Sequence, residues 1–281
     1  SPAASFAPPT PPARATTFIE FPPVNASVAS ACYLSIVEIL VAEPFENPED
    51  GFGLQQAILE EVAEAERGPT ALMWSSDRYV GATRLETRLP GFDEATRWAG
   101  GVGFPVLVRN SGGGAVAANR GSLSFSLTYP VDDLRHGLYE RYAEGVDLIA
   151  AALQRVGVAA EGGEVEGEFC PGAYSVRSGG ARGTKHAGLA QRVTRRAARL
   201  EALILVQNTA EVAAVLEGFY GALGLPFRTA SVADVPASVP RVIEALAAET
   251  GERYETAEGW IGEALLERAR ALRGTWRAHA G

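Results

Sequence analysis

Lys185 and Cys170 are the two residues whose types best suit them to chemistry. Lys185 is the only lysine among 25 lysine and arginine residues, so arginine serves almost everywhere else that a cation is needed. An ammonium is a compact charge that can give up its proton, whereas a guanidinium stays charged and presents a broad planar fork. Cys170, one of two cysteines, lies 15 residues before Lys185. We interpret them as a reactive pair; the alternative is that one lysine survived by chance.

The segment around Cys170 predicts an accessible thiol. Pro171 and Gly172 follow the cysteine directly, and a Pro-Gly pair marks a turn. Cys170 is therefore expected at the lip of a loop, where a large substrate can reach it. A thiol attacks as its thiolate, which a nearby cation favours. Cys32 lies within an apolar run and is interpreted as a structural residue.

The segment after Lys185 predicts a strand with room for a ligand. Ala187, Gly188 and Ala190 are small, so a bound molecule could lie against the backbone. Alternation along a strand places Lys185 and His186 on opposite faces. We therefore interpret His186 as a packed or exposed residue and not as a catalytic base.

A glycine cluster forms a third candidate segment, reading Arg109-Asn110-Ser111-Gly112-Gly113-Gly114-Ala115-Val116. Backbone amides without neighbouring side chains can cradle a phosphate or stabilise an oxyanion. The spacing does not match a P-loop, which requires Gly-Lys-Ser/Thr. It does not match the dinucleotide fingerprint either, because a strand is expected to follow and not a helix. A flexible turn remains the alternative.

The composition excludes several classes of protein. The 281 residues are 47% hydrophobic and carry a net charge of −9, which argues against nucleic-acid binding or a polybasic membrane anchor. No apolar run is long enough for a membrane helix. The three histidines are scattered and show no metal-site spacing. Two widely separated cysteines fit a reducing compartment, so a cytoplasmic protein is expected.

The order of predicted elements indicates an α+β domain. Residues 1–16 are mostly Ser, Pro, Ala and Thr and are expected to be a disordered tail. Residues 17–230 are expected to form the catalytic domain, and residues 231–281 a helical C-terminal extension. Residues 29–42 predict a buried strand or a short helix. Helices are expected at 52–66, 92–99, 132–156, 211–223, 242–249 and 260–272, and strands at 71–74, 78–80, 106–109, 123–129, 174–176, 187–193 and 202–207.

Taken together, the three segments resemble the superfamily of lipoate-protein ligases, lipoyl and octanoyl transferases and biotin ligases. The glycine cluster is similar to the Arg-x-Ser-Gly-Gly-Gly-Ala-Val acyl-binding motif, and residues 185–191 are similar to the lysine motif Lys-x-x-Gly-x-(Ser/Ala)-Gln. Cys-Pro-Gly-x-Tyr at residues 170–174 is similar to a narrower branch, the octanoyl-[glycine cleavage H protein]:protein N-octanoyltransferases. The resemblance covers roughly residues 45–225. It implies the mixed sheet flanked by helices that biotin ligases share with class II synthetases.

The resemblance also implies roles for individual residues. Cys170 would be the nucleophile that forms an acyl thioester, and Lys185 would favour its thiolate and contact the acyl carbonyl. The acyl group would be octanoyl or lipoyl, and its binding site would be formed by Arg109, Ser111, Gly112, Gly113, Gly114, Ala115, Ala187 and Gly188.

The implied reaction is the transfer of this acyl group between two proteins. The donor would be the glycine cleavage H protein or an acyl carrier protein, and the acceptors would be lipoyl domains of 2-oxoacid dehydrogenase E2 subunits. Exchange of one amide for another is close to balanced in energy, so no ATP is expected. No metal or other cofactor is predicted either. An ATP-dependent lipoate-protein ligase and a non-catalytic protein that binds acyl groups or lipoyl domains remain alternatives.

Overall fold

The computed structural model describes residues 36–134, 137–228 and 231–278. The expected tail at residues 1–16, together with Cys32, His136 and His279, lies outside the described residues. The larger of two sheets has the strand order β11 (Thr256–Glu258), β1 (Val37–Val41), β2 (Thr70–Trp74), β6 (Ser122–Pro130), β10 (Ala197–Leu205), β9 (Thr184–Val193), β8 (Ser175–Ser178) and β7 (Ala160–Gly162). β1 is parallel to both of its neighbours, and the other neighbouring strands are antiparallel.

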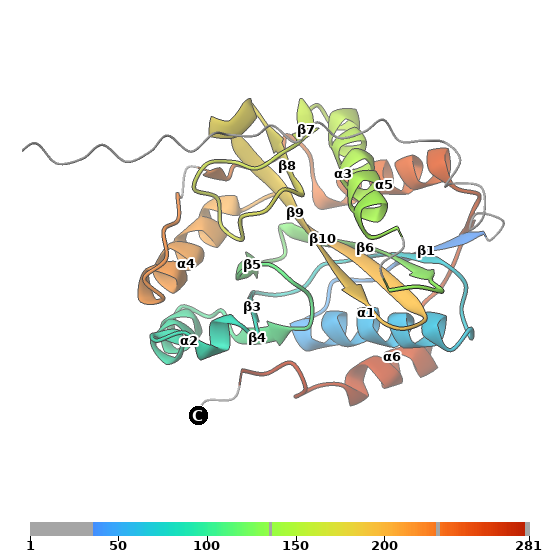
Figure 1. Cartoon of the computed structure of the whole chain (residues 1–281), viewed down its shortest axis with the longest axis horizontal. Coiled ribbons are helices and arrows are strands. Elements are labelled where there is room, and N and C mark those ends of the chain that lie inside the picture. Colours follow the sequence, from blue (N-terminus) through green and yellow to red (C-terminus); the bar gives the residue numbers. More distant parts are fainter. Residues whose placement is uncertain (1–35, 135–136, 229–230, 279–281) are drawn as a thin grey trace, which may run out of the picture.

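A smaller sheet has the order β4 (Val106–Arg109), β3 (Tyr79–Thr83) and β5 (Val116–Ala118). Helices flank both sheets (Figure 1): α3 (Leu138–Arg155) and α5 (Val239–Arg253) pack together on one face of the larger sheet, and α1 (Pro48–Ala63) and α6 (Glu263–Ala271) pack together on the other. α2 (Phe92–Gly101) and α4 (Thr209–Ala222) cover the smaller sheet, and η1 (Glu86–Arg88) and η2 (Gly180–Arg182) are short 3-10 turns. These mixed sheets flanked by helices confirm the predicted α+β class.

The central strand β6 shows how the layers form. Leu123, Phe125 and Leu127 point into the core beneath α3 and α5. The alternating sequence predicts that the other face of this strand is polar and open to water, yet Ser126 and Thr128 are also buried. The prediction of one buried face was wrong because α1 packs against β6. The face of the larger sheet opposite α3 and α5 is therefore covered by α1.

Most predicted elements are present, with shifts at their ends. α1 begins earlier than expected because Asn47 caps it, its side chain accepting a hydrogen bond from the Glu49 amide at 3.0 Å, and Pro48 occupies the first turn. α3 was expected from residue 132 but begins at Leu138, after Gly137 in a left-handed conformation (φ +70°). The ambiguous segment before residue 42 is a strand where it is described.

The segment expected as a helical extension is an integral part of the fold. Val242 and Leu246 of α5 belong to the same core cluster as β6. β11 adds a parallel edge strand to β1, so the segment is not only helical. Beyond α6, the Trp276 ring lies 5.8 Å from the Phe52 ring between centroids. The C-terminal segment therefore completes the layer that carries α1.

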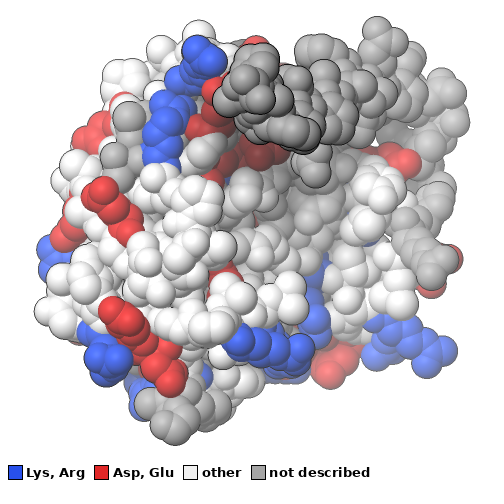
Figure 2. Space-filling model, turned by 60° about the vertical axis from the view of Figure 1, so that its left-hand side comes forward, with Lys and Arg blue, Asp and Glu red and all other residues white. Residues whose placement is uncertain are grey.

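The surface carries both signs of charge. On the side that bears α2 and α4, acidic and basic side chains are interspersed among uncharged ones (Figure 2). None of the helices in the described ranges combines the length and apolarity needed to cross a membrane.

Candidate active site

A narrow cavity lies between the larger sheet, α1 and the loop that carries Cys170. One wall is aromatic, formed by Phe52, Trp74 and Tyr79, and aliphatic side chains including Leu189 and Leu203 complete it. The Phe52 ring lies 5.8 Å from the Trp74 ring and 5.2 Å from the Tyr79 ring, between centroids. The volume is about 50 Å³, whereas a cavity that admits benzene measures roughly 150 Å³. An eight-carbon chain can enter only if lining side chains move.

Cys170 and Lys185 both line this cavity, as do Arg109 and Gly188. The structure therefore brings together residues that the sequence singled out in three separate segments. Cys170 belongs to the loop between β7 and β8 (residues 163–174, the cysteine loop) and is only partly buried. Its backbone is left-handed, with φ +43°. A residue other than glycine pays a free-energy cost for this conformation, so neighbouring contacts must hold it.

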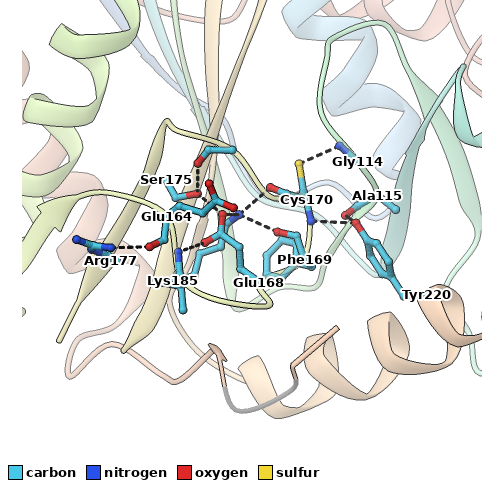
Figure 3. A network of polar contacts seen from close by, with 12 residues as sticks. Gly114, Ala115, Glu164, Glu168, Phe169, Cys170, Ser175, Arg177, Lys185 and Tyr220 are labelled. Carbon is cyan, nitrogen blue, oxygen red and sulfur yellow. Dashed lines mark hydrogen bonds and ion pairs between the residues drawn. The ribbon is translucent and has the colours of Figure 1, made fainter. Parts of the chain in front are cut away.

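The glycine cluster (residues 110–115, the glycine loop) lies against the thiol (Figure 3). The Gly114 amide donates a hydrogen bond to the Cys170 Sγ at 3.1 Å, and Nη2 of Arg109 lies 3.7 Å from the same sulfur. A Cβ atom at Gly113 would lie 2.7 Å from Sγ and 2.8 Å from Nη2 of Arg109. Glycine is required here because a side chain would displace the sulfur or the guanidinium.

Lys185 is completely buried and points at the backbone of the cysteine loop. Its Nζ donates to the Phe169 carbonyl at 2.9 Å, the Cys170 carbonyl at 3.0 Å and Oε1 of Glu168 at 3.1 Å (Figure 3). It also lies 4.6 Å from the centre of the Phe169 ring, a cation–π distance. The cation in hydrogen-bonding contact with the sulfur is therefore Arg109, and Lys185 contacts the main chain of the same residue.

Glu168 completes this buried ion pair. Its Oε1 also accepts from the Ser175 hydroxyl at 2.6 Å, and its Oε2 accepts from the Val165 amide at 3.0 Å. Both side chains of the Glu168–Lys185 pair are inaccessible to solvent. A buried pair of charges is costly unless further hydrogen bonds satisfy it, and here both members are satisfied by the cysteine loop and its neighbours.

A β-bulge brings Lys185 to the cavity. The pairing of β8 with β9 shifts register between Val176 and Arg177, so that Val176 pairs with Ala187 and Arg177 with Lys185. An extra residue interrupts strict alternation, and Lys185 lines the cavity together with Gly188 and Ala190. A Cβ at Gly188 would lie 3.2 Å from Lys185 Cε. Gly188 thus makes room for the lysine as well as for a ligand.

The prediction that Ala187 lines the acyl site was wrong. Its side chain belongs to the core cluster on the opposite face, with Val176 and Ile204, because it alternates with Gly188. His186 is buried, and its Nε2 lies 2.8 Å from the Ser178 hydroxyl. Burial lowers the pKa of His186 below its ordinary value of 6.5. This contact fits the interpretation of His186 as a packed residue.

Arg109 and Ser111 belong to a buried network beneath the glycine loop. Nη1 of Arg109 donates to the Ser111 hydroxyl at 2.9 Å, and Nη2 donates to the Gly114 carbonyl at 2.8 Å. The Ser111 hydroxyl donates to Glu201, which Arg199 holds through Nε at 2.8 Å. Burial alone would raise the pKa of Glu201, but the charges of Arg199 and Arg109 and the bond from Ser111 hold it below its ordinary value. The network fixes the guanidinium of Arg109 beside the thiol.

The sequence did not reveal two further residues that hold the loops together. The Tyr220 hydroxyl on α4 accepts from the Cys170 amide at 2.9 Å and donates to the Ala115 carbonyl at 2.8 Å. Glu86 on η1 accepts from the Ala115 amide at 2.6 Å. Burial, and then the charge at Cys170, raises the pKa of Tyr220 well above its ordinary value, so the phenol keeps its proton.

The remaining predicted site residues flank the thiol without forming the cavity walls. The Gly114 amide bonds the Cys170 sulfur, and the Ala115 amide bonds Glu86. An added Cβ at Gly112 would face open space. Among the described residues, no three His, Cys, Asp or Glu side chains gather as a metal site would require. The arrangement offers a thiol, an adjacent amide and guanidinium, and an apolar slot, which are the components for holding an acyl chain on sulfur.

Comparisons with known proteins show the family of this chain. Residues 47–261 match the lipoyl protein ligase A/B catalytic domain, so the chain belongs to the lipoyl protein ligase A/B family. An octanoyl-[GcvH]:protein N-octanoyltransferase from Geobacillus kaustophilus is 30% identical over 178 residues, which are 63% of this chain and 62% of that protein. A lipoyl-[GcvH]:protein N-lipoyltransferase from Listeria monocytogenes is 29% identical over 119 residues, 42% of each chain.

The fold also matches a solved structure. The crystal structure of a lipoate-protein ligase A bound with ATP superimposes with a TM-score of 0.68 at 20% identity, covering 85% of this chain and 94% of that one. This similarity confirms the fold that the resemblance implied. The matched regions of the Geobacillus and Listeria proteins span less than two thirds of their lengths.

Proposed function

We propose that this protein is an acyltransferase that moves an octanoyl or lipoyl group from a carrier protein to the lysine of a lipoyl domain through a thioester on Cys170. The observation that carries the proposal is the thiol beside a narrow apolar cavity, with the Gly114 amide 3.1 Å from its sulfur. The names of the Geobacillus and Listeria relatives support transfer of either group and point to GcvH as the donor. Acyl carrier protein is the alternative donor.

The first half of the reaction loads the enzyme. The Cys170 sulfur attacks the carbonyl carbon of the acyl amide on the donor lysine, so a C–S bond forms. The tetrahedral oxyanion collapses, the C–N bond breaks, and the donor lysine leaves as an amine carrying the proton that the thiol gave up. Backbone amides of the glycine loop stabilise the oxyanion, since the loop lies directly against the sulfur.

The second half reverses these steps with a new amine. The lysine of an acceptor lipoyl domain, such as that of a 2-oxoacid dehydrogenase E2 subunit, attacks the thioester carbonyl. The C–N bond forms, the C–S bond breaks and the thiol is restored. One amide is exchanged for another, so the proposed reaction needs no ATP. A free reactive thiol requires a reducing compartment, so the proposal places the enzyme in the cytoplasm.

Intact-mass spectrometry tests the proposal directly. The protein is incubated with octanoyl-GcvH, with octanoyl-acyl carrier protein, or with octanoate and ATP, and the enzyme is weighed before an acceptor domain is added. We expect an octanoyl adduct with a carrier protein, its absence in Cys170→Ser, and its transfer to an added lipoyl domain. Product that requires ATP and persists in Cys170→Ser would establish the ligase reaction instead. Absence of adduct and of product with every donor would favour a binding protein.

A further inference from the structure

Two cations lie near the thiol, and their hydrogen bonds differ. An ammonium has three N–H donors, and those of Lys185 meet the Phe169 carbonyl, the Cys170 carbonyl and Glu168. These partners account for all of its donors. Lys185 therefore has no N–H left for the sulfur unless one of these bonds is broken.

Arg109, unlike Lys185, directs an N–H donor at the sulfur and has another donor without a partner in the part of the chain that the structure describes. Its Nη2 lies 3.7 Å from the Cys170 sulfur, and its Nε is buried without a hydrogen-bond partner among the described residues. Its side chain is nine-tenths buried, so water screens its charge only weakly. The guanidinium is also fixed in place, because Ser111 and the Gly114 carbonyl hold both terminal nitrogens.

We propose that Arg109 is the catalytic cation of the Cys170 thiolate, acting with the Gly114 amide, and that Lys185 is a positioning residue that fixes the cysteine loop. The inference rests on the proposed function in one respect, namely that Cys170 is the nucleophile. Guanidinium and amide approach the sulfur directly, whereas the ammonium binds the carbonyls that precede and belong to Cys170. Lys185 thereby holds the left-handed backbone of Cys170 in place.

The other charged groups around the thiol support this division. From the cysteine loop, Glu168 faces Lys185 and cancels its charge at 3.1 Å. From β10, Glu201 bonds Arg199 at 2.8 Å and lies 3.7 Å from Nη1 of Arg109, so two guanidiniums share one carboxylate and the group keeps a net positive charge. The guanidinium of Arg109 is left with a positive charge that a thiolate can balance.

Two more titratable groups approach from the remaining elements. Glu86 on η1 bonds the Ala115 and Thr83 amides behind the glycine loop. Its negative charge disfavours a nearby thiolate, which makes a cation at the sulfur more necessary. Tyr220 on α4 remains a neutral phenol and bonds the Cys170 amide. Of the described cations, only Arg109 thus combines contact with the sulfur and an incompletely neutralised charge.

Alkylation of the thiol by iodoacetamide tests the inference without any acyl donor. In a Cys32→Ser background, Cys170 is the only thiol, and the alkylation rate is measured from pH 5 to pH 10 together with thiolate absorbance near 240 nm. For Arg109→Gln we expect the pH midpoint to rise by about one unit or more, because a cation close to an acidic group shifts its titration by this amount. Arg109→Lys keeps a charge and should restore part of the shift.

A matched control variant removes the charge of Lys185 together with that of its ion-pair partner Glu168. Lys185→Met combined with Glu168→Gln leaves no unpaired charge, and we expect its pH midpoint to rise less than that of Arg109→Gln, because Tyr220 still holds the Cys170 amide near Arg109. Acyl transfer in this double variant should fall at least tenfold through kcat, because the cysteine loop loses its anchor. Circular dichroism confirms that each variant is folded.

Two outcomes would overturn the inference. An unchanged midpoint in folded Arg109→Gln contradicts it, and so does a rise in the double variant that equals or exceeds the rise in Arg109→Gln, which would assign the thiolate to Lys185. If the double variant does not fold, Arg109→Gln still decides. A failure to detect acyl transfer would count against the proposed function while leaving the alkylation result intact.

Discussion

The hydroxyl of Tyr220 lies 2.9 Å from the backbone nitrogen of Cys170 and accepts its hydrogen bond. The same hydroxyl donates to the Ala115 carbonyl, so a side chain of α4 joins the cysteine loop to the glycine loop. Because the Cys170 amide is occupied by this bond, it is not free to stabilise an oxyanion. The Ala115 amide is likewise occupied by Glu86, so the Gly114 amide beside the sulfur is the donor placed for that role.

Replacing Tyr220 by phenylalanine should separate the two loops. The variant leaves the Cys170 amide and the Ala115 carbonyl without their partner, and a buried group without its partner costs about 1–3 kcal/mol. We expect thermal unfolding at a lower temperature and a rate of acyl-enzyme formation at least tenfold lower. Tyr139→Phe is the matched control, since Tyr139 is exposed. Equal behaviour of the two variants would contradict the role given to Tyr220.

Two glycines of the glycine loop should respond differently to the same substitution. Gly113 has φ +99°, and its added Cβ would lie 2.7 Å from the Cys170 sulfur, whereas an added Cβ at Gly112 meets nothing within 4 Å. We expect Gly113→Ala to lose most acyl transfer and Gly112→Ala to lose little. Steady-state rates with saturating donor measure the difference. A Gly113→Ala enzyme as active as Gly112→Ala would show that the loop moves away from the thiol during turnover.

The preference for acyl groups of a given length should depend on the side chains that line the cavity. Ala190 is buried and lines the narrow cavity, so Ala190→Leu takes up space that a long chain needs. Each buried methylene contributes about 0.8 kcal/mol, and the substitution should lower transfer of octanoyl at least tenfold relative to butanoyl. The ratio of kcat/KM for the two donors measures this effect. An unchanged ratio would place the acyl chain elsewhere.

The stability of the protein should fall at mildly acidic pH through His186. Burial lowers the pKa of His186 below 6.5, so on acidification the unfolded chain binds the proton first. The contribution of neutral His186 to the free energy of unfolding is therefore complete above pH 6.5. It is lost as the pH falls through the pKa of His186 in the folded protein, by at most about 1.4 kcal/mol per pH unit. Urea unfolding at pH 7.5 and 5.5 measures the loss. His186→Gln should reduce the difference, and an identical pH dependence would exclude His186 as its source.

Local patterns predicted much of the site. Arg109, Cys170, Lys185, Gly188 and Ala190 line one cavity, and the glycine loop lies against the thiol, because each pattern reflects a backbone requirement that is local in sequence. The strands and helices were likewise recognised from periodicity. The contacts that Lys185 makes within the protein were not predicted: its three bonds go to Glu168 and two carbonyls, and these depend on the fold of a loop that carries no periodic signal.

Contacts between distant segments could not be predicted. Tyr220 lies on an apolar helix, where a tyrosine is typical of a core residue, and its two bonds depend on how α4 packs against the loops. The error at Ala187 arose from the β-bulge beside Lys185, which changes the side of the strand on which later residues lie. Glu168 and Glu86 resembled ordinary loop carboxylates because their partners are backbone amides and a lysine from other elements.

The contact between Phe52 and Trp276 has a consequence for biosynthesis. Phe52 forms part of the cavity wall, and its ring is supported from behind by a residue that the ribosome adds much later. A nascent chain that has already exposed Cys170 still lacks this support. The cavity wall is therefore complete only when the segment bearing α6 and Trp276 has left the ribosome and has docked against α1.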